Sequence, residues 1–210
     1  MSTLLIGLSL VIQAGGLSQR MGHDKGLVGF LGQSLVQRQI ERLSPIADEV
    51  LVTTNNAEQY HFLGVPLAGD LMPGTGALGG LYTALSAARH PAAAVVACDM
   101  PFANPDLIKY QYHLLLATGA DLVIPRTPHG LEPFHAVYRR AVCLPHVRAI
   151  LQSGQRRVDA WFGQVKVRYV EENEILRHDP KNLAFLNVNT LEELHAAEQI
   201  AKEHPEELKD

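Results

Sequence analysis

The chain has 210 residues, 47% of them hydrophobic, which is enough to bury a substantial core, and a single domain spanning residues 1–210 is expected. A net charge of −4 and a pI near 6.2 leave no basic field, which argues against a dedicated nucleic-acid or membrane-surface protein. The two cysteines, Cys98 and Cys143, give no disulfide framework and favour a reducing cytoplasm.

A buried strand is the first predicted element, at residues 8–13. The apolar run that contains it, residues 4–12, lacks the positive charge of a signal peptide and is too short to span a membrane. A glycine-rich loop follows at residues 14–25, and an amphipathic helix pattern covers residues 34–43. This order of strand, loop and helix is typical of an α/β unit.

The loop at residues 14–25 predicts a polyphosphate site. Its glycines carry no side chains, so backbone N–H groups can close on an anion, and Arg20 and Lys25 add positive charge. The loop is not a P-loop, which needs Gly-Lys-Ser/Thr, and it lacks the Gly-x-Gly-x-x-Gly pattern of dinucleotide-binding proteins. The alternative is a glycine-rich turn whose charges are merely solvated.

The elements that follow alternate between strand and helix at short intervals, which predicts a mainly parallel, doubly wound sheet. The fold class expected is therefore α/β. Further strands are expected at residues 49–53, 65–68, 92–98, 119–125, 134–138 and 165–170, and helical segments at residues 55–63, 78–88, 105–117, 141–152 and from residue 191 onwards.

A second glycine-dense loop, residues 69–80, enters its helix without a polar spacer. Small residues let the backbone approach a flat ligand, and main-chain groups around Leu78, Gly79 and Gly80 can then contact the edge of a base. The alternative is a flexible surface loop.

Asp99 directly follows the buried strand at residues 92–98. Ligands in open α/β sheets bind outside the carboxyl ends of the strands, and a carboxylate that faces a phosphate loop there suits Mg²⁺. Alternatively, Asp99 only ends the strand or caps the next helix.

Polar pairs in the second half are candidates for contacting a second substrate. Arg156 and Arg157 are expected to begin a new helix, where guanidinium groups suit a phosphate or a ring carbonyl. Asn187 and Asn189 are expected on one face of a strand, so that both amides point into the cleft. The alternatives are solvated arginines and turn-forming asparagines.

Two shorter patterns complete the set. Glu132 and His135 are three residues apart on a predicted strand, which places them on opposite faces and argues against an acid–base dyad. Thr190 with Glu193 predicts a capping box at the start of the last helix.

Several of these segments together resemble one family. Gly-Gly-x-Ser-x-Arg-Met-Gly-x-Asp-Lys at residues 15–25 is similar to the signature loop of nucleotidyltransferases, and its second half to that of molybdenum cofactor guanylyltransferases and their cytidylyltransferase relatives. Further matches are Pro-Gly-x-Gly-x-Leu-x-Gly at residues 73–80, Cys-Asp-Met-Pro-Phe at 98–102, Pro-x-x-Ala-x-Tyr at 133–138, Gly-x-Arg-Arg-Val at 154–158 and Phe-x-Asn-Val-Asn-Thr-x-Glu-Glu-Leu at 185–194. The chain departs from the family at Gln13, where leucine is usual, and at Thr53, where asparagine is frequent.

The resemblance implies a Rossmann-like nucleotidyltransferase fold and transfer of GMP from GTP to the phosphate of molybdenum-molybdopterin, with Mg²⁺ as cofactor and pyrophosphate as product. It assigns catalysis to Lys25, Arg20 and Asp99, with Asp99 as the metal ligand. It places the nucleotide at Gln13, Ala14, Gly15, Gly16, Lys25, Asp70, Leu78, Gly79, Gly80 and Asp99, and the acceptor at Arg156, Arg157, Asn187 and Asn189.

Other functions stay open on the sequence alone. Cytidylyl or other nucleotidyl transfer, to molybdopterin or to another phosphorylated small molecule, would use the same loops. A non-catalytic GTP-binding protein that handles the cofactor would keep the fold, and molybdoenzyme apoproteins and cofactor-biosynthesis proteins are the implied partners. A nicotinamide-dependent oxidoreductase is disfavoured because its phosphate fingerprint is missing.

Overall fold

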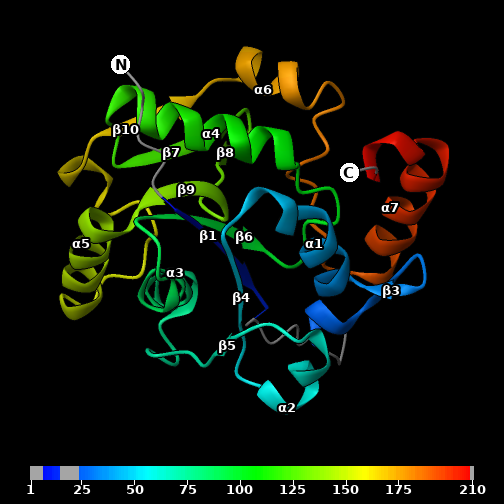
Figure 1. Cartoon of the computed structure of the whole chain (residues 1–210), viewed down its shortest axis with the longest axis horizontal. Coiled ribbons are helices and arrows are strands. Elements are labelled where there is room, and N and C mark those ends of the chain that lie inside the picture. The colour runs from blue at the N-terminus through cyan, green and yellow to red at the C-terminus, as the bar shows by residue number, and fades with distance from the viewer. Residues whose placement is uncertain (1–6, 15–23, 209–210) are drawn as a thin grey trace.

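The computed structural model describes residues 7–14 and 24–208 of the chain (Figure 1). Within this part, the main sheet has eight strands in the order β10-β7-β9-β6-β1-β4-β5, with β8 paired to β7. Its strands are β1 (Leu8–Gln13), β4 (Glu49–Thr53), β5 (Leu67–Ala68), β6 (Ala92–Ala97), β7 (Leu122–Thr127), β8 (Gly130–Leu131), β9 (His135–Arg139) and β10 (Val167–Val170). A separate hairpin pairs β2 (Gly29–Phe30) with β3 (Gln33–Ser34).

The pairing is parallel between β1 and β4, β1 and β6, β4 and β5, and β7 and β10. Strands β8 and β9 are the exceptions, because β9 runs antiparallel to both β6 and β7, and β8 runs antiparallel to β7. Only residues 128–134 separate β7 from β9, and a parallel neighbour would need a longer crossover. The prediction of a mainly parallel sheet is therefore confirmed, with two reversed strands.

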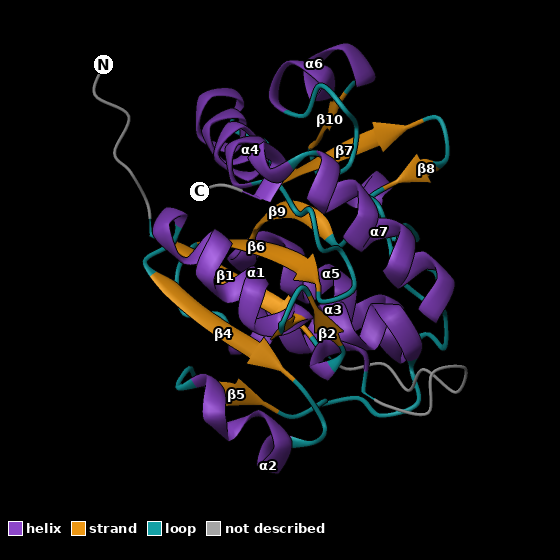
Figure 2. Ribbon diagram, turned by 90° about the vertical axis from the view of Figure 1, so that its right-hand side faces the viewer, coloured by secondary structure: helices purple, strands orange, loops and turns teal. Residues whose placement is uncertain are grey.

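Helices cover both faces of the sheet, as Figures 1 and 2 show. On one face, Leu10 and Ile12 of β1 pack in a cluster with residues of α1 and α4, and on the other face Val11 packs with residues of α3 and α5. The doubly wound arrangement is thus confirmed. The helices are α1 (Leu35–Leu43), α2 (Ala57–Tyr60), α3 (Gly76–Ala87), α4 (Pro105–Thr118), α5 (Arg140–Gln152), α6 (Glu172–His178) and α7 (Leu191–Glu203).

Two predicted elements are wrong. Residues 155–157 have no regular secondary structure and residues 158–161 form a turn, so no helix begins at Arg156. This turn carries Trp161, which is fully buried and packs against Tyr138 and Phe162, so core packing decides the local backbone. The segment at residues 185–190 is not a strand, because its backbone bonds go to Asp99 and to the start of α7 rather than to a sheet neighbour.

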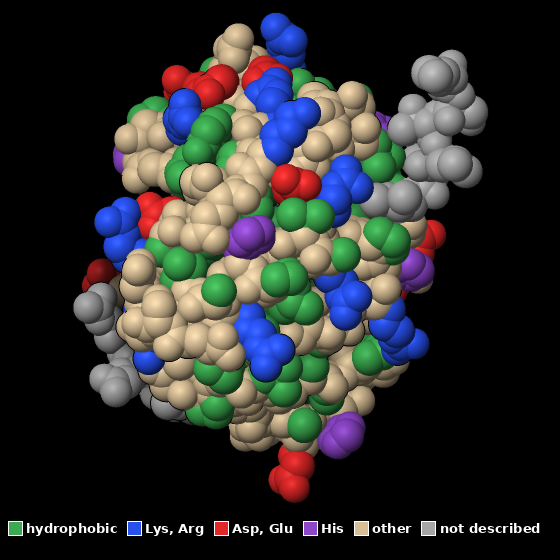
Figure 3. Space-filling model, turned by 90° about the vertical axis from the view of Figure 1, so that its left-hand side faces the viewer, with side chains coloured by type: hydrophobic (Ala, Val, Ile, Leu, Met, Phe, Trp, Pro, Cys, Tyr) green, Lys and Arg blue, Asp and Glu red, His purple; other side chains and the backbone are tan. Residues whose placement is uncertain are grey.

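The described surface fits the weak net charge. On the face drawn in Figure 3, Lys and Arg side chains are interspersed with acidic and apolar ones and do not form one continuous basic patch. Among the described residues, no helix combines the length and the apolar character needed to cross a membrane. Cys98 and Cys143 are both buried free thiols, and burial raises the pKa of Cys143 to about 12.

Candidate functional site

The carboxyl edge of the parallel strands brings two predicted loops together. Strands β1, β4 and β6 end there at Gln13, Thr53 and Ala97. The sheet pairing continues one residue further, since Ala14 N donates to Thr53 O and Cys98 N donates to Gln13 O, both at 2.9 Å. The chain therefore leaves β1 and β6 side by side, which places Lys25 and Asp99 at one edge.

A network around Asp24 fixes the start of the short helical turn that carries Lys25. Asp24 caps this turn by accepting from Gly26 N at 3.2 Å, and the hydroxyl of buried Tyr60 donates to the same carboxylate. Gly26 is required here, because a Cβ at this position would lie 2.5 Å from Tyr60 Oη. Lys25 is thus placed by its neighbours before any ligand contacts it.

Lys25 Nζ donates to Asp99 Oδ2 at 3.0 Å and to Asn189 Oδ1 at 2.5 Å. The side chains of Lys25 and Asp99 are 20% and 18% exposed, so this ion pair is largely shielded but still reachable. Both residues line one cavity of about 320 Å³, together with Gln13, Gly76, Ala77, Gly80, Ala97, Cys98 and Phe134.

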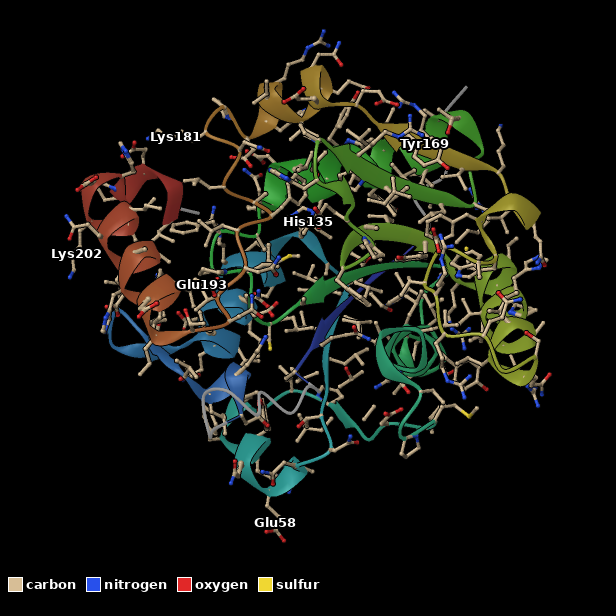
Figure 4. The ribbon with its side chains drawn as sticks, turned by 180° about the vertical axis from the view of Figure 1, so that it is seen from behind. Glu58, His135, Tyr169, Lys181, Glu193 and Lys202 are labelled. Atoms are coloured by element: carbon tan, nitrogen blue, oxygen red, sulfur yellow. The ribbon has the colours of Figure 1, made fainter. Side chains whose placement is uncertain are left out.

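The chain segment before α7 supports this ion pair. Val188 N donates to the backbone oxygen of Asp99 at 2.9 Å, which docks the segment on the end of β6. The predicted capping box is confirmed, since Thr190 and Glu193 exchange hydrogen bonds, and Glu193 also accepts from Asn189 N at 2.6 Å. Figure 4 shows Glu193 at the amino end of α7, on the side that faces the sheet. The cap therefore positions the amide that contacts Lys25.

Asn189→Ala is expected to lower the kcat of the nucleotidyl transfer expected from the sequence by about 10-fold. Lys25 loses one of its two acceptors in this variant, so its ammonium group is held less firmly in position. Asn173→Ala is the matched control, since Asn173 is exposed on α6 and lines neither hollow. Steady-state kinetics of both variants measure the difference. If Asn189→Ala instead raises only the KM for the acceptor, Asn189 binds the acceptor and does not position Lys25.

A second, smaller hollow adjoins the cavity on the side of β4 and β5. Asp70 lies in it, and its Oδ1 accepts from Met72 N at 2.9 Å and lies 3.1 Å from the Thr83 hydroxyl. The backbone N–H of Asp70 donates to Asn55 Oδ1 at 2.9 Å, so the main chain at this residue is held as well. The hollow is lined by Gln13, Thr53, Thr54, Asn55, Asp70, Gly80 and Thr83.

Glycines at the start of α3 allow close approach between this helix and the hollows. A Cβ on Gly79 would lie 1.8 Å from Thr75 Oγ1, and one on Gly80 would lie 2.9 Å from Gln13 Nε2. Gly80 lines both hollows, as predicted for a segment that approaches a ligand. The side chain of Leu78 is fully buried in the core and lines neither of them.

The family model of the MobA-like NTP transferase domain matches residues 10–168 of the chain. The chain belongs to the MobA-like NTP transferase family. A probable molybdenum cofactor guanylyltransferase of Peptoclostridium acidaminophilum is 34% identical over 200 residues, which cover 93% of this chain and 90% of that protein. The resemblance seen in the sequence is thereby confirmed.

Solved structures support the same grouping. The crystal structure of molybdopterin-guanine dinucleotide biosynthesis protein A from Archaeoglobus fulgidus matches with a TM-score of 0.80 at 25% identity, covering 93% of this chain and 99% of that one. A 4-diphosphocytidyl-2C-methyl-D-erythritol synthase from Anaerococcus prevotii matches at 12% identity with a TM-score of 0.71, covering 93% and 96% of the two chains. The Rossmann-like nucleotidyltransferase fold is therefore confirmed.

In this MobA-like transferase, the residues expected to hold Mg²⁺ are few. Among the described residues, no group of three or more His, Cys, Asp and Glu side chains is placed to bind a metal ion. The site offers the carboxylate of Asp99 and the amide oxygen of Asn189. Both accept hydrogen bonds from the ammonium group of Lys25. Because Mg²⁺ commonly takes one or two carboxylates and completes its shell with water and substrate phosphates, this donor set fits a cation that arrives with a triphosphate.

The four residues predicted on the acceptor side do not come together. Arg157 is exposed and pairs with Asp159 at 2.7 Å, and exposed Arg156 donates to the backbone oxygen next to it. Neither arginine lines either hollow. Asn187 is exposed as well. Of the four, Asn189 alone contacts a residue that lines the cavity, Lys25, among the described residues. A role for these four residues in acceptor binding stays a prediction.

The other predicted residues divide into three groups. Gln13, Lys25, Asp70, Gly80 and Asp99 line the hollows, as expected for a nucleotide site. Ala14 and Gly79 are buried beside them and line neither. Gly15, Gly16 and Arg20 lie outside the described residues.

Several residues that line the hollows escaped the sequence-based prediction, among them Phe134, Asn55 and Thr83. Phe134 directly precedes the reversed strand β9, and its backbone oxygen accepts from Ala97 N at 3.0 Å. Asn55 follows the end of β4, which was an available signal because Asp99 stands in the same position after β6. Thr83 lies one helical turn beyond Gly79 and accordingly faces the same side of α3.

His135 and Glu132 do not form a dyad, as predicted. His135, labelled in Figure 4, is fully buried, and its Nε2 accepts from Asn104 N at 3.2 Å. Glu132 is partly buried, and the hydroxyl of Thr127 donates to it at 3.5 Å. Burial raises the pKa of Glu132 and, together with Arg42, lowers that of His135 to about 4, so His135 is a neutral structural residue.

Acid is expected to destabilise the fold through His135. Its pKa is about 4 when folded and about 6.5 when unfolded, so neutral His135 contributes fully above pH 6.5 and this contribution is lost as the pH falls to 4. The loss amounts to about 3 kcal/mol of the free energy of unfolding. Urea unfolding at pH 7 and pH 4.5 measures it, and His135→Gln should flatten the dependence whereas exposed His129→Gln should not. An unchanged slope in His135→Gln would contradict the assignment.

Proposed function

We propose that this protein transfers GMP from GTP to the terminal phosphate of molybdopterin that carries molybdenum, and releases pyrophosphate. Its relatives are named molybdenum cofactor guanylyltransferases, and the solved relative from Archaeoglobus fulgidus is named for molybdopterin-guanine dinucleotide biosynthesis.

The observation that carries the proposal is the contact between Lys25 and Asp99 in one cavity. A cation and a carboxylate in contact at the carboxyl edge of the sheet provide charge for a polyphosphate and an oxygen donor for its metal ion. The hollow around Asp70 adjoins this cavity through Gln13 and Gly80, so a nucleotide can extend from one into the other.

The chemistry needs no general base. The phosphate oxygen of the acceptor, already ionised at neutral pH, attacks the α-phosphorus of GTP. The bond from that phosphorus to the oxygen bridging the α- and β-phosphates breaks, and the electron pair leaves with pyrophosphate. Catalysis then depends on positioning and on stabilising negative charge. Lys25 supplies positive charge to the leaving group, and we assign Arg20 and the amides of Ala14, Gly15 and Gly16 to the same task.

We assign Mg²⁺ binding to Asp99, whose carboxylate would hold the ion at the triphosphate of GTP. When bound, the ion supplies charge neutralisation and orientation of the phosphates. Lys25 holds the Asp99 carboxylate at the cavity, and the docked backbone of Val188 fixes the end of the strand.

Thermal shift with four nucleoside triphosphates tests the choice of substrate. GTP with Mg²⁺, at 100 times its Kd, should raise Tm by about 5–10 °C, and CTP, ATP and UTP should do so much less. Pyrophosphate release in the presence of GTP and molybdenum-molybdopterin then tests turnover. A larger shift with CTP would favour cytidylyl transfer, and GTP binding without pyrophosphate release would favour a non-catalytic cofactor-handling protein.

Location and partners follow from the proposed chemistry. We place the reaction in the cytoplasm, where the thiols Cys98 and Cys143 stay reduced. The product must pass to molybdoenzyme apoproteins, so these and other cofactor-biosynthesis proteins are the proposed partners.

A further inference from the structure

Gln13 ends β1 with a buried donor that has no partner within residues 7–14 and 24–208. Its Nε2 is buried and makes no hydrogen bond among the described residues. Buried polar groups in folded proteins nearly always have a partner, because an unpaired donor keeps the cost of leaving water. Among the described residues with such an atom, Gln13 is the only one that lines either hollow of the site.

The position of this amide is between the two parts of the site. Gln13 and Gly80 are the two residues that line both hollows. On one side lie Lys25 and Asp99, and on the other side lies Asp70. The missing side chain of Gly80 lets the backbone of α3 approach Gln13 Nε2, since a Cβ there would lie only 2.9 Å away. The amide is therefore confined at the junction.

The chemistry of the smaller hollow is complementary to one base. Guanine presents an acceptor, O6, beside two donors, N1–H and the 2-amino group. Asp70 provides only acceptor atoms, and Gln13 Nε2 provides only donors. Adenine carries an amino group where guanine carries O6, so the donor of Gln13 would meet another donor. A leucine at this position, which is usual in the family, has no polar side-chain atom and could not distinguish guanine from adenine in this way.

We propose that Gln13 Nε2 donates to O6 of guanine and selects guanine over purines that lack an acceptor at this position. This inference rests on the proposed function and adds a specificity-determining residue to it. Asp70 reads the opposite part of the same edge, and Gln13 supplies the second of two complementary contacts.

Binding calorimetry with nucleotide analogues tests the contact. The probes are GTP, 6-thio-GTP, in which a poorly accepting sulfur replaces O6, and ITP, which lacks only the 2-amino group. The wild-type protein should bind GTP about 10-fold more tightly than 6-thio-GTP. In Gln13→Leu this ratio should fall to about 1, because the donor is gone, whereas the ratio of GTP to ITP should stay unchanged.

Two further variants make the result specific. Gln199→Leu, the same change at an exposed position of α7, should keep the wild-type ratios. Gln13→Glu keeps the size of the side chain and replaces its donor by an acceptor. It should favour 2,6-diaminopurine riboside triphosphate, which carries an amino group at C6, over GTP, and it provides the test if Gln13→Leu fails to fold.

The outcomes separate this inference from the proposed function. If Gln13→Leu weakens GTP and 6-thio-GTP by the same factor, Gln13 contacts the ribose or phosphates and the inference is overturned. If the wild-type protein binds CTP in preference to GTP, the proposed function is overturned. GTP binding with an unchanged ratio of GTP to 6-thio-GTP in Gln13→Leu removes the role of Gln13 alone.

Discussion

Lys25→Ala is expected to lower kcat by about 100-fold or more, since loss of one group that stabilises transition-state charge typically has an effect of this size. Lys25 contacts Asp99 and Asn189 and lines the cavity, and it is held there by the capped turn that begins at Asp24. Steady-state pyrophosphate release at saturating GTP measures the change.

The control for this variant is Lys109→Ala. Lys109 is a half-exposed lysine on α4 that also pairs with an aspartate, Asp106, but lines neither hollow. Its removal should leave kcat unchanged. Lys25→Arg keeps the charge but replaces a compact ammonium by a planar group, so a partial loss is expected. Turnover near the wild-type level in Lys25→Ala would contradict the role given to this residue.

Asp99→Asn is expected to remove the magnesium dependence of GTP binding and to lower kcat by about 100-fold or more. The substitution keeps the shape of the side chain and the backbone bond from Val188 to residue 99, so the fold should persist. Calorimetric titration of GTP with and without Mg²⁺ measures the difference between the two affinities.

Exposed Asp106 on α4 offers the matched control, because Asp106→Asn removes a carboxylate outside the site. This variant should respond to Mg²⁺ as the wild-type protein does. If Asp99→Asn also keeps a full response to Mg²⁺, the metal ion is held elsewhere and Asp99 acts only by positioning Lys25.

The sequence was most informative where side chains follow the ends of parallel strands. Lys25 and Asp99 are 74 positions apart, yet each belongs to a loop that leaves the same edge, and parallel topology brings these loops together. Glycine content predicted the close approach at Gly80 for a similar reason. Such local signals were sufficient for the doubly wound fold and for placing several of the proposed nucleotide-site residues at one edge of the sheet.

The remaining parts of the site depend on tertiary contacts that no local pattern records. Phe134 reaches the cavity only because β9 inserts beside β6 in reverse direction. Asn187 and Asn189 are two residues apart, but their side chains do not point to the same place. With Val188 docked on Asp99 between them, Asn187 is exposed and Asn189 contacts Lys25. The helix predicted to begin at Arg156 and Arg157 does not form, because burial of Trp161 determines the turn that follows these residues.

Because β9 runs in the reverse direction, the cleft is lined both by residues that follow the ends of strands and by a residue that precedes the start of one. From β1 and β6 the cavity receives residues at the carboxyl ends of strands, whereas from β9 it receives Phe134, the residue that directly precedes the strand. The turn that ends at Phe134 can change in length or composition without shifting the register of the strands that carry Gln13 and Asp99. A graft of the 128–134 hairpin from a related transferase should therefore alter the choice of acceptor while the affinity for nucleotide is retained.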